Sequence, residues 1–151
     1  ITLAESLRTL NNLIGYTEGK SQYKFSVSID GSIQGEFDIP IEVLQILVTL
    51  IKNSVDAVSE NSNSWIKLNI GMTGKIFSFQ VIDSGDGVSP FARDNIFDPF
   101  FTTKEVGAGK GLGLSEARGL AHQINGSLEC DFRAKDTTFE LRFEYSSELA
   151  A

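Results

Sequence analysis

The sequence is poor in several residue types, and each shortage excludes a class of protein. A single cysteine, Cys130, excludes an internal disulfide and fits a reducing compartment. The single histidine, His122, has no cluster of cysteines or carboxylates near it, which argues against a zinc site. No apolar run approaches the roughly 20 residues that a membrane-spanning helix needs, and no signal peptide is visible. Lysine and arginine number 13 against 20 acidic residues, and the formal charge of −7 argues against nonspecific binding to nucleic acid.

The rest of the composition is that of an ordinary globular domain. Its 151 residues suit one domain with a hydrophobic core, and we find no internal repeat or low-complexity tract. The only methionine is Met72 and the chain opens on Ile1, so we expect a piece of a longer polypeptide. We expect this piece to be cytoplasmic, whether or not its parent is anchored in a membrane.

Apolar periodicity predicts three helices. The first spans residues 2–14 and is ended by Gly15. The second is long, is opened by Pro40 as a first-turn residue, and steps its apolar residues by three and four as far as Val58. The third covers about 112–124. The second helix is apolar around most of its circumference, and its remaining polar stripe consists of Gln45, Thr49, Lys52, Asn53 and Asp56.

Other stretches read as strands. They are residues 23–30, residues 35–39 as a hairpin partner after a turn at Asp30-Gly31, residues 65–70, 76–82, 127–132 and 138–145. The elements lack the regular rhythm of a doubly wound sheet. We therefore predict the α+β class: a two-layer α/β sandwich in which helices cover one face of a mostly antiparallel sheet.

A glycine-rich run, "GAGKGLGLSEARG" at 107–119, leads directly into the third helix. It fits neither the dinucleotide-binding pattern G-x-G-x-x-G nor the Walker A pattern. A linker without a ligand is one interpretation. The other is a phosphate site, because the first N–H groups of a helix are unpaired and glycine lets an anion approach them closely.

Three further features could carry chemistry, and each has a plainer alternative. Asp83 in "DSGDGV" could accept a hydrogen bond from a base, or could belong to a simple turn. The stretch "IFDPFFTTK" at 96–104 could be a movable nucleotide cover or a satellite of the core. Asn53 could bind Mg²⁺ through its amide oxygen, or could be satisfied by neighbouring backbone.

The order of these features is more specific than any one of them. "IKNSVDAV", "VIDSGDGV", "IFDPFFTTK" and "GAGKGLGLS" resemble the N, G1, F and G2 boxes of the catalytic domain of sensor histidine kinases. That domain belongs to the superfamily of gyrase, heat-shock chaperone, histidine kinase and mismatch-repair ATPases. The resemblance spans about 38–145. It implies a Bergerat fold with about five strands and about three helices, in which ATP lies between the long helix and a lid.

The resemblance also implies roles for individual residues. Asn53 matches the catalytic, Mg²⁺-binding asparagine, Asp83 the adenine-reading aspartate, and Phe97 and Phe100 the aromatics of the lid. Lys104 and Lys110 would contact phosphates, and Thr137 would lie near the adenine. The residues expected around ATP are Asn53, Asp56, Ala57, Asp83, Gly85, Gly87, Val88, Phe97, Phe100, Lys104, Gly109, Lys110, Gly111, Leu112, Gly113, Leu114 and Thr137.

The departures from the family pattern carry information too. Thr49 replaces an asparagine found in many kinases, and the hydrolysing members of the superfamily have a glutamate there to activate water. Asp56 stands where some members have a lysine, Ile124-Asn125-Gly126 replaces His-Gly-Gly, and Asp136 replaces a glycine. Without a base at position 49, the site suits transfer of the γ-phosphoryl group to a histidine brought by another domain.

The resemblance implies an organisation and partners as well. Residues 1–15 would connect from a helical dimerisation and phosphoacceptor domain of the same parent, 16–145 would be the ATP-binding domain, and 146–151 a tail or linker. The parent would be a homodimer that serves a response regulator, and the isolated piece a monomer. Two alternatives stay open: a serine/threonine kinase of the anti-sigma type, disfavoured by Thr49, and a degenerate module that signals only by contact, disfavoured by Asn53 and Asp83.

Overall fold

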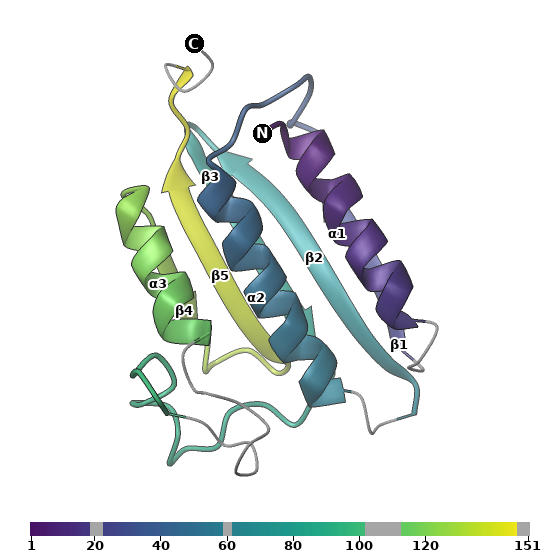
Figure 1. Cartoon of the computed structure of the whole chain (residues 1–151), viewed down its shortest axis with the longest axis vertical. Coiled ribbons are helices and arrows are strands. Elements are labelled where there is room, and N and C mark those ends of the chain that lie inside the picture. The colour runs from purple at the N-terminus through teal and green to yellow at the C-terminus, as the bar shows by residue number, and fades with distance from the viewer. Residues whose placement is uncertain (19–22, 59–61, 102–112, 148–151) are drawn as a thin grey trace.

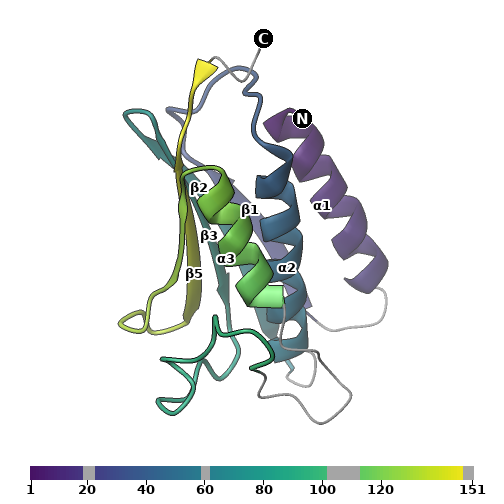
Figure 2. The same ribbon diagram turned by 60° about the vertical axis from the view of Figure 1, so that its left-hand side comes forward.

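In the part of the chain that the structure describes, the fold is a five-stranded sheet with three helices packed on one of its faces (Figure 1). The computed structural model describes residues 1–18, 23–58, 62–101 and 113–147. Its elements are α1 (Leu3–Glu18), β1 (Tyr23–Ile29), α2 (Ile41–Val58), β2 (Ser64–Thr73), β3 (Ile76–Asp83), α3 (Gly113–Gln123), β4 (Ser127–Cys130) and β5 (Thr137–Glu144). Turned by 60°, the helices lie on one side and the strands on the other (Figure 2). The predicted two-layer sandwich is confirmed.

The sheet is mixed and mostly antiparallel, as predicted. Its strand order is β1-β2-β3-β5-β4, and only β1 and β2 run parallel. The register of β3 and β5 places Asp83, the last residue of β3, opposite Thr137, the first residue of β5. Two predicted site residues thus meet at one end of this antiparallel strand pair.

Two local predictions were wrong. Residues 35–39 form no strand beside β1; their only ladder contact is a single bridge from Asp38 to Thr2. The reason is competition for backbone groups: the Phe37 carbonyl accepts from the Leu3 N–H at 2.8 Å, and the Ile39 N–H donates to the Ile1 carbonyl at 2.9 Å. The segment is therefore bonded to the N-terminal residues instead of to β1, whose strand partner is β2.

The second error concerns the end of α1. The helix continues past Gly15 to Glu18. A glycine inside a helix costs about 1 kcal/mol relative to alanine. Packing outweighs this cost, because Leu10 and Ile14 on the preceding turns are buried in the core.

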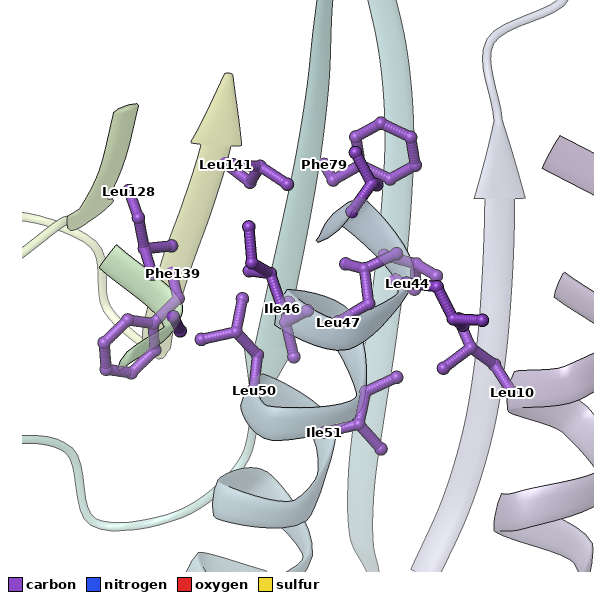
Figure 3. Close-up of a cluster of buried hydrophobic side chains, with 14 of the residues drawn as sticks. Leu10, Leu44, Ile46, Leu47, Leu50, Ile51, Phe79, Leu128, Phe139 and Leu141 are labelled. Carbon is purple, nitrogen blue, oxygen red and sulfur yellow. The ribbon is translucent and has the colours of Figure 1, made fainter. Parts of the chain in front are cut away.

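The central helix α2 contributes more buried hydrophobic side chains to the core than α1 or α3 does. Pro40 precedes it, and the Val43 N–H donates to the Pro40 carbonyl at 3.0 Å, so the predicted start of the helix is confirmed. Ile46, Leu47 and Leu50 are fully buried. Figure 3 shows these side chains among those of the sheet and of α1, with Leu44 of α2 pointing toward Leu10 of α1. This packing fixes the position of α2 over the sheet.

The segment that follows β3 lies beyond the C-terminal end of α2, at the end of the molecule where α3 begins (Figures 1 and 2). Residues 84–101 contain neither helix nor strand. They are anchored from within by Ala92 and Ile96, which are both buried. Among the described residues, none of the helices has the length and apolar character needed to cross a membrane.

Candidate functional site

The site is built around a buried carboxylate at the end of a strand. Asp83 is 2% exposed, and the N–H of Gly85 donates to its Oδ1 at 2.9 Å. Burial raises the pKa of Asp83 above its usual value of 3.8, while hydrogen bonds from the Ser54 hydroxyl, the Gly85 N–H and the Thr137 hydroxyl act in the opposite direction. Repulsion from Asp136 adds a smaller increase to the same pKa. The Ser54 hydroxyl and the Gly85 N–H thus hold the carboxyl group from α2 and from the loop after β3, and the Thr137 hydroxyl approaches it from β5 without full hydrogen-bond geometry.

The loop after Asp83 approaches both this carboxylate and α2 very closely. A Cβ atom on Gly85 would lie 2.9 Å from Oδ1 of Asp83 and 3.0 Å from Cβ of Ala57. Gly87 has a φ of +82°, a backbone conformation that favours glycine. Val88 is half-buried and packs against the core. The structure therefore brings together Ala57, Asp83 and Gly85, three of the residues expected around the nucleotide.

Thr137 completes this group from β5. A Cβ atom on Gly87 would lie 3.7 Å from its Oγ1. That Oγ1 is buried and reaches no partner with full hydrogen-bond geometry among the described residues. A buried hydroxyl without such a partner is uncommon, and it is available to a ligand or to a bridging water.

The sequence prediction missed Ser54. This residue is 2% exposed and its hydroxyl bonds to Asp83, so it links α2 to the end of β3. A signal was present: Leu47, Leu50, Ser54 and Val58 follow each other by three or four residues, which puts a serine on the apolar face of α2. A polar residue at a core-facing position needs a partner, and Asp83 is that partner.

Asn53 lies one residue before Ser54 and is half-buried. Thr49, one turn earlier on the same side of α2, approaches the first residue of α3: a Cβ atom on Gly113 would lie 3.3 Å from its Cγ2. Asp56 is exposed. The start of α3, which is the predicted phosphate-binding helix start, therefore contacts α2 one turn before Asn53, the predicted metal ligand. Leu114, the next residue of α3, is half-buried.

The polar stripe of α2 extends from this point along the helix interface. Gln45 and Thr49 line a groove of about 560 Å³ between α2 and α3. On the α3 side its lining consists of Glu116, Ala117, Gly119, Leu120 and Gln123. The polar stripe of α2 thus faces the groove at Gln45 and Thr49 and reaches the candidate site at Asn53.

The two predicted aromatics have different environments. The ring of Phe97 is half-buried and packs edge-on against Phe139, with 6.2 Å between the centroids. Phe100 is 75% exposed and has a φ of +65°. Lys104, Gly109, Lys110, Gly111 and Leu112 lie outside the described residues. The contacts predicted for Phe100 and for those five residues stay predictions.

The residues present fit a nucleotide with a metal ion. Gly85 keeps this wall of the site free of side-chain atoms, because even a Cβ atom would collide with Asp83 and Ala57, and the Thr137 hydroxyl adds a polar group without a full hydrogen bond in the described chain. In the part of the chain that the structure describes, no group of three or more His, Cys, Asp or Glu side chains could hold a metal. Magnesium is commonly held by one or two protein oxygens together with phosphates and water, which is the arrangement that a lone Asn53 suits.

Comparison with known proteins identifies relatives of this chain. The sequence profile described as histidine kinase-, DNA gyrase B-, and HSP90-like ATPase matches residues 38–147. The sensory histidine kinase/phosphatase NtrB of Rhizobium meliloti (strain 1021) is 32% identical over 142 residues, which cover 85% of this chain and 37% of that protein. The sensor kinase CckA of Brucella abortus (strain 2308) is 48% identical over 64 residues, 42% of this chain and 7% of that protein. The chain thus spans well under half the length of these relatives.

Solved structures show the same fold. The nucleotide-free catalytic domain of the histidine kinase ThkA superposes with a TM-score of 0.79 at 26% identity, covering 96% of this chain and 97% of that one. A structure of ThkA in complex with the response regulator protein TrrA matches with a TM-score of 0.74 at 21% identity, covering 98% of this chain and 42% of that one.

Proposed function

The chain belongs to the family of histidine kinase-, DNA gyrase B- and HSP90-like ATPases, and on that premise we propose that it is the ATP-binding catalytic domain of a sensor histidine kinase. It binds Mg·ATP at the end of the sheet where α2, β3 and β5 meet. It then supports transfer of the γ-phosphoryl group to a histidine on a separate helical domain of its parent. The observation that carries this proposal is the buried Asp83, held by Ser54 and Gly85 at the start of a loop that carries glycine at positions 85 and 87.

Asp83 recognises the adenine in this proposal. Its carboxylate accepts a hydrogen bond from the exocyclic amino group, and its own partners keep it from turning away. Gly85 and Gly87 let the base approach the backbone, and the Thr137 hydroxyl supplies a further polar group, directly or through a water molecule. A fixed, buried carboxylate discriminates well between bases, because a base without an amino group would leave one of its acceptor positions without a donor.

Asn53 is the proposed ligand of the metal ion. When bound, ATP provides the γ-phosphoryl group, and Mg²⁺ neutralises charge on its phosphate oxygens. The start of α3 at Gly113 directs the first N–H groups of the helix and the positive end of its dipole toward the phosphates. The predicted lid, which includes Lys104 and Lys110, would cover them.

Thr49 is the feature that favours phosphoryl transfer over hydrolysis. It lies one turn before Asn53, where the hydrolysing members of the superfamily carry a glutamate. A threonine hydroxyl is not a base at neutral pH, so no side chain at this position activates water. A neutral histidine on another domain needs no such base, since its ring nitrogen attacks with its own lone pair.

The expected partners follow from this reaction. The phosphoacceptor histidine would lie on a helical dimerisation domain, and a response regulator would take the phosphoryl group from it, consistent with the ThkA–TrrA complex. We propose that the chain works in the cytoplasm as part of a homodimeric parent, that it binds no nucleic acid, and that the isolated chain is a monomer. Residues 1–15 would lead from the helical domain and residues 146–151 would form a tail.

The test is calorimetric titration of the chain with ATP, with and without Mg²⁺, for wild type and Asn53→Ala. We expect Mg²⁺ to strengthen binding to wild type at least tenfold and to have little effect on Asn53→Ala. Asn11→Ala, on the exposed face of α1, is the matched control and should behave as wild type. Labelled ATP and the parent's helical domain then test transfer. Wild type that fails to bind Mg·ATP, or that hydrolyses it rapidly without any acceptor, would contradict the proposal.

A further inference from the structure

Arg118 on α3 makes two contacts that join three parts of the fold. Its guanidinium carbon lies 4.5 Å from the centroid of the Phe97 ring. Its Nη2 donates to Oε1 of Glu129 on β4 at 3.0 Å. Its Nε is buried and has no acceptor among the described residues. The Phe97 ring and the Glu129 carboxylate are therefore the contacts that hold this guanidinium in place.

Phe97 in turn lies beside the base of the proposed nucleotide site. Its ring packs edge-on against Phe139. Phe139 follows Thr137 by two residues on β5, so the two side chains share a face of the sheet. Thr137 is the residue opposite Asp83. The Phe97 ring thus contacts both Arg118 and Phe139, next to the group that includes Asp83.

This arrangement matters because Phe97 lies outside the regular secondary structure. It belongs to residues 84–101, which contain no helix or strand to fix their side chains. Arg118 belongs to α3, which is anchored by the buried Ala117 and Ala121 on the same helix. A cation over an aromatic face is attracted by the ring quadrupole. Because α3 is fixed in the fold, contact with Arg118 restricts the position of the Phe97 ring.

We propose that Arg118 is a positioning residue for the nucleotide site, acting through Phe97. It holds the ring at the side of the site, and Glu129 fixes the direction of its guanidinium. The inference rests on the proposed function, since it assigns Arg118 an effect on nucleotide affinity. That effect passes through the Phe97 ring and requires no contact between Arg118 and the nucleotide.

A double-mutant cycle on Mg·ATP affinity tests this role. Phe97→Leu keeps an apolar side chain but removes the ring face. We expect Arg118→Ala and Phe97→Leu each to weaken binding about tenfold, and the double variant to be no weaker than Phe97→Leu alone. Arg118→Lys keeps the charge and should recover part of the affinity. Arg142→Ala is the matched control: Arg142 also pairs with a glutamate, Glu140 at 2.9 Å, but on β5 and with the side chain largely exposed.

A second measurement separates positioning from general stability. Fluorine NMR of 4-fluorophenylalanine at position 97, without nucleotide, should show a shifted signal in Arg118→Ala and an unchanged one in Arg142→Ala. Affinity of Arg118→Ala equal to wild type, or losses that add in the double variant, would overturn the inference while leaving the proposed function intact. Absence of Mg·ATP binding by wild type would overturn both.

Discussion

The N–H of Gly85 donates a 2.9 Å hydrogen bond to the carboxylate of Asp83, two residues before it. The loop after β3 thus turns back onto the side chain that ends the strand. The same turn brings the α-carbon of Gly85 so close to Ala57 that a Cβ atom would meet it at 3.0 Å. Backbone rather than side chain therefore forms this wall of the site, and the nucleotide affinity of the chain should depend on it.

Gly85→Ala should damage both the site and the fold. The added methyl group must displace Asp83 or α2, and overpacking of this kind costs about 1–3 kcal/mol. We expect a loss of stability in that range by urea denaturation and at least tenfold weaker Mg·ATP binding. Gly15→Ala is the control, because no atom lies within 4 Å of its Cβ position and it sits inside α1. It should stabilise the chain by up to about 1 kcal/mol. Unchanged nucleotide affinity in Gly85→Ala would contradict the assigned geometry.

Asp83→Asn should separate binding from stability. Loss of a hydrogen bond to a charged group costs about 1.5–3 kcal/mol, so Mg·ATP affinity should fall by roughly 10- to 150-fold in calorimetry. The fold should tolerate the change, since the amide keeps the size of the carboxyl group and Ser54 can still bond to it. A variant that binds Mg·ATP as wild type does would remove Asp83 from adenine recognition.

The stability of Asp83→Asn relative to wild type should also depend on pH. Burial raises the pKa of Asp83 in the folded state, so folding favours its protonated form. Its contribution to stability is therefore greatest at low pH and falls as the pH rises from 3.8 through the raised value. Across that pH interval, the free energy of unfolding of Asp83→Asn should rise relative to that of wild type. Asp30→Asn should show the opposite trend, because hydrogen bonds from Ser32 lower the pKa of Asp30.

Thr49→Glu should introduce ATP hydrolysis. It places a carboxylate one turn before Asn53, where it can accept a proton from water, and general-base catalysis contributes about 10²–10⁴ in rate. Thr49→Gln has the same shape without the base and is the control. We expect steady-state hydrolysis by Thr49→Glu to exceed that of Thr49→Gln by at least tenfold. Equal rates in two variants that both bind Mg·ATP would show that more than this residue separates transfer from hydrolysis.

Cys130 should be almost inert in the folded chain. Burial, with the nearby charges of Asp131 and Asp83, raises the pKa of its thiol from 9.0 to about 12. Only the thiolate reacts, so at pH 8 alkylation by iodoacetamide should be about 1,000-fold slower than in the unfolded chain. The raised pKa also means that the contribution of Cys130 to stability falls as the pH rises above 9.0. Equal alkylation rates with and without urea would contradict this.

Much of the fold could be predicted because the signals are local. The spacing of apolar residues in α2 indicates which side of that helix faces the sheet, and alternation in β2 and β3 does the same for the strands. The order of the four motifs singles out Asn53 and Asp83 without reference to the fold. A periodicity or a motif is contained in a short stretch of chain, so these features follow from the sequence alone.

Which of these elements meet depends on the tertiary fold. Residues 35–39 have a strand-like pattern, yet their backbone groups bond to residues 1–3, which lie far away in the sequence. Ser54 and Arg118 acquire roles through partners 29 and 21 residues distant, Asp83 and Phe97. Such choices depend on the competition between distant groups for the same partner, and on desolvation that exists only once the chain has packed. The outcome of that competition cannot be predicted from the pattern of residues in a short stretch of sequence.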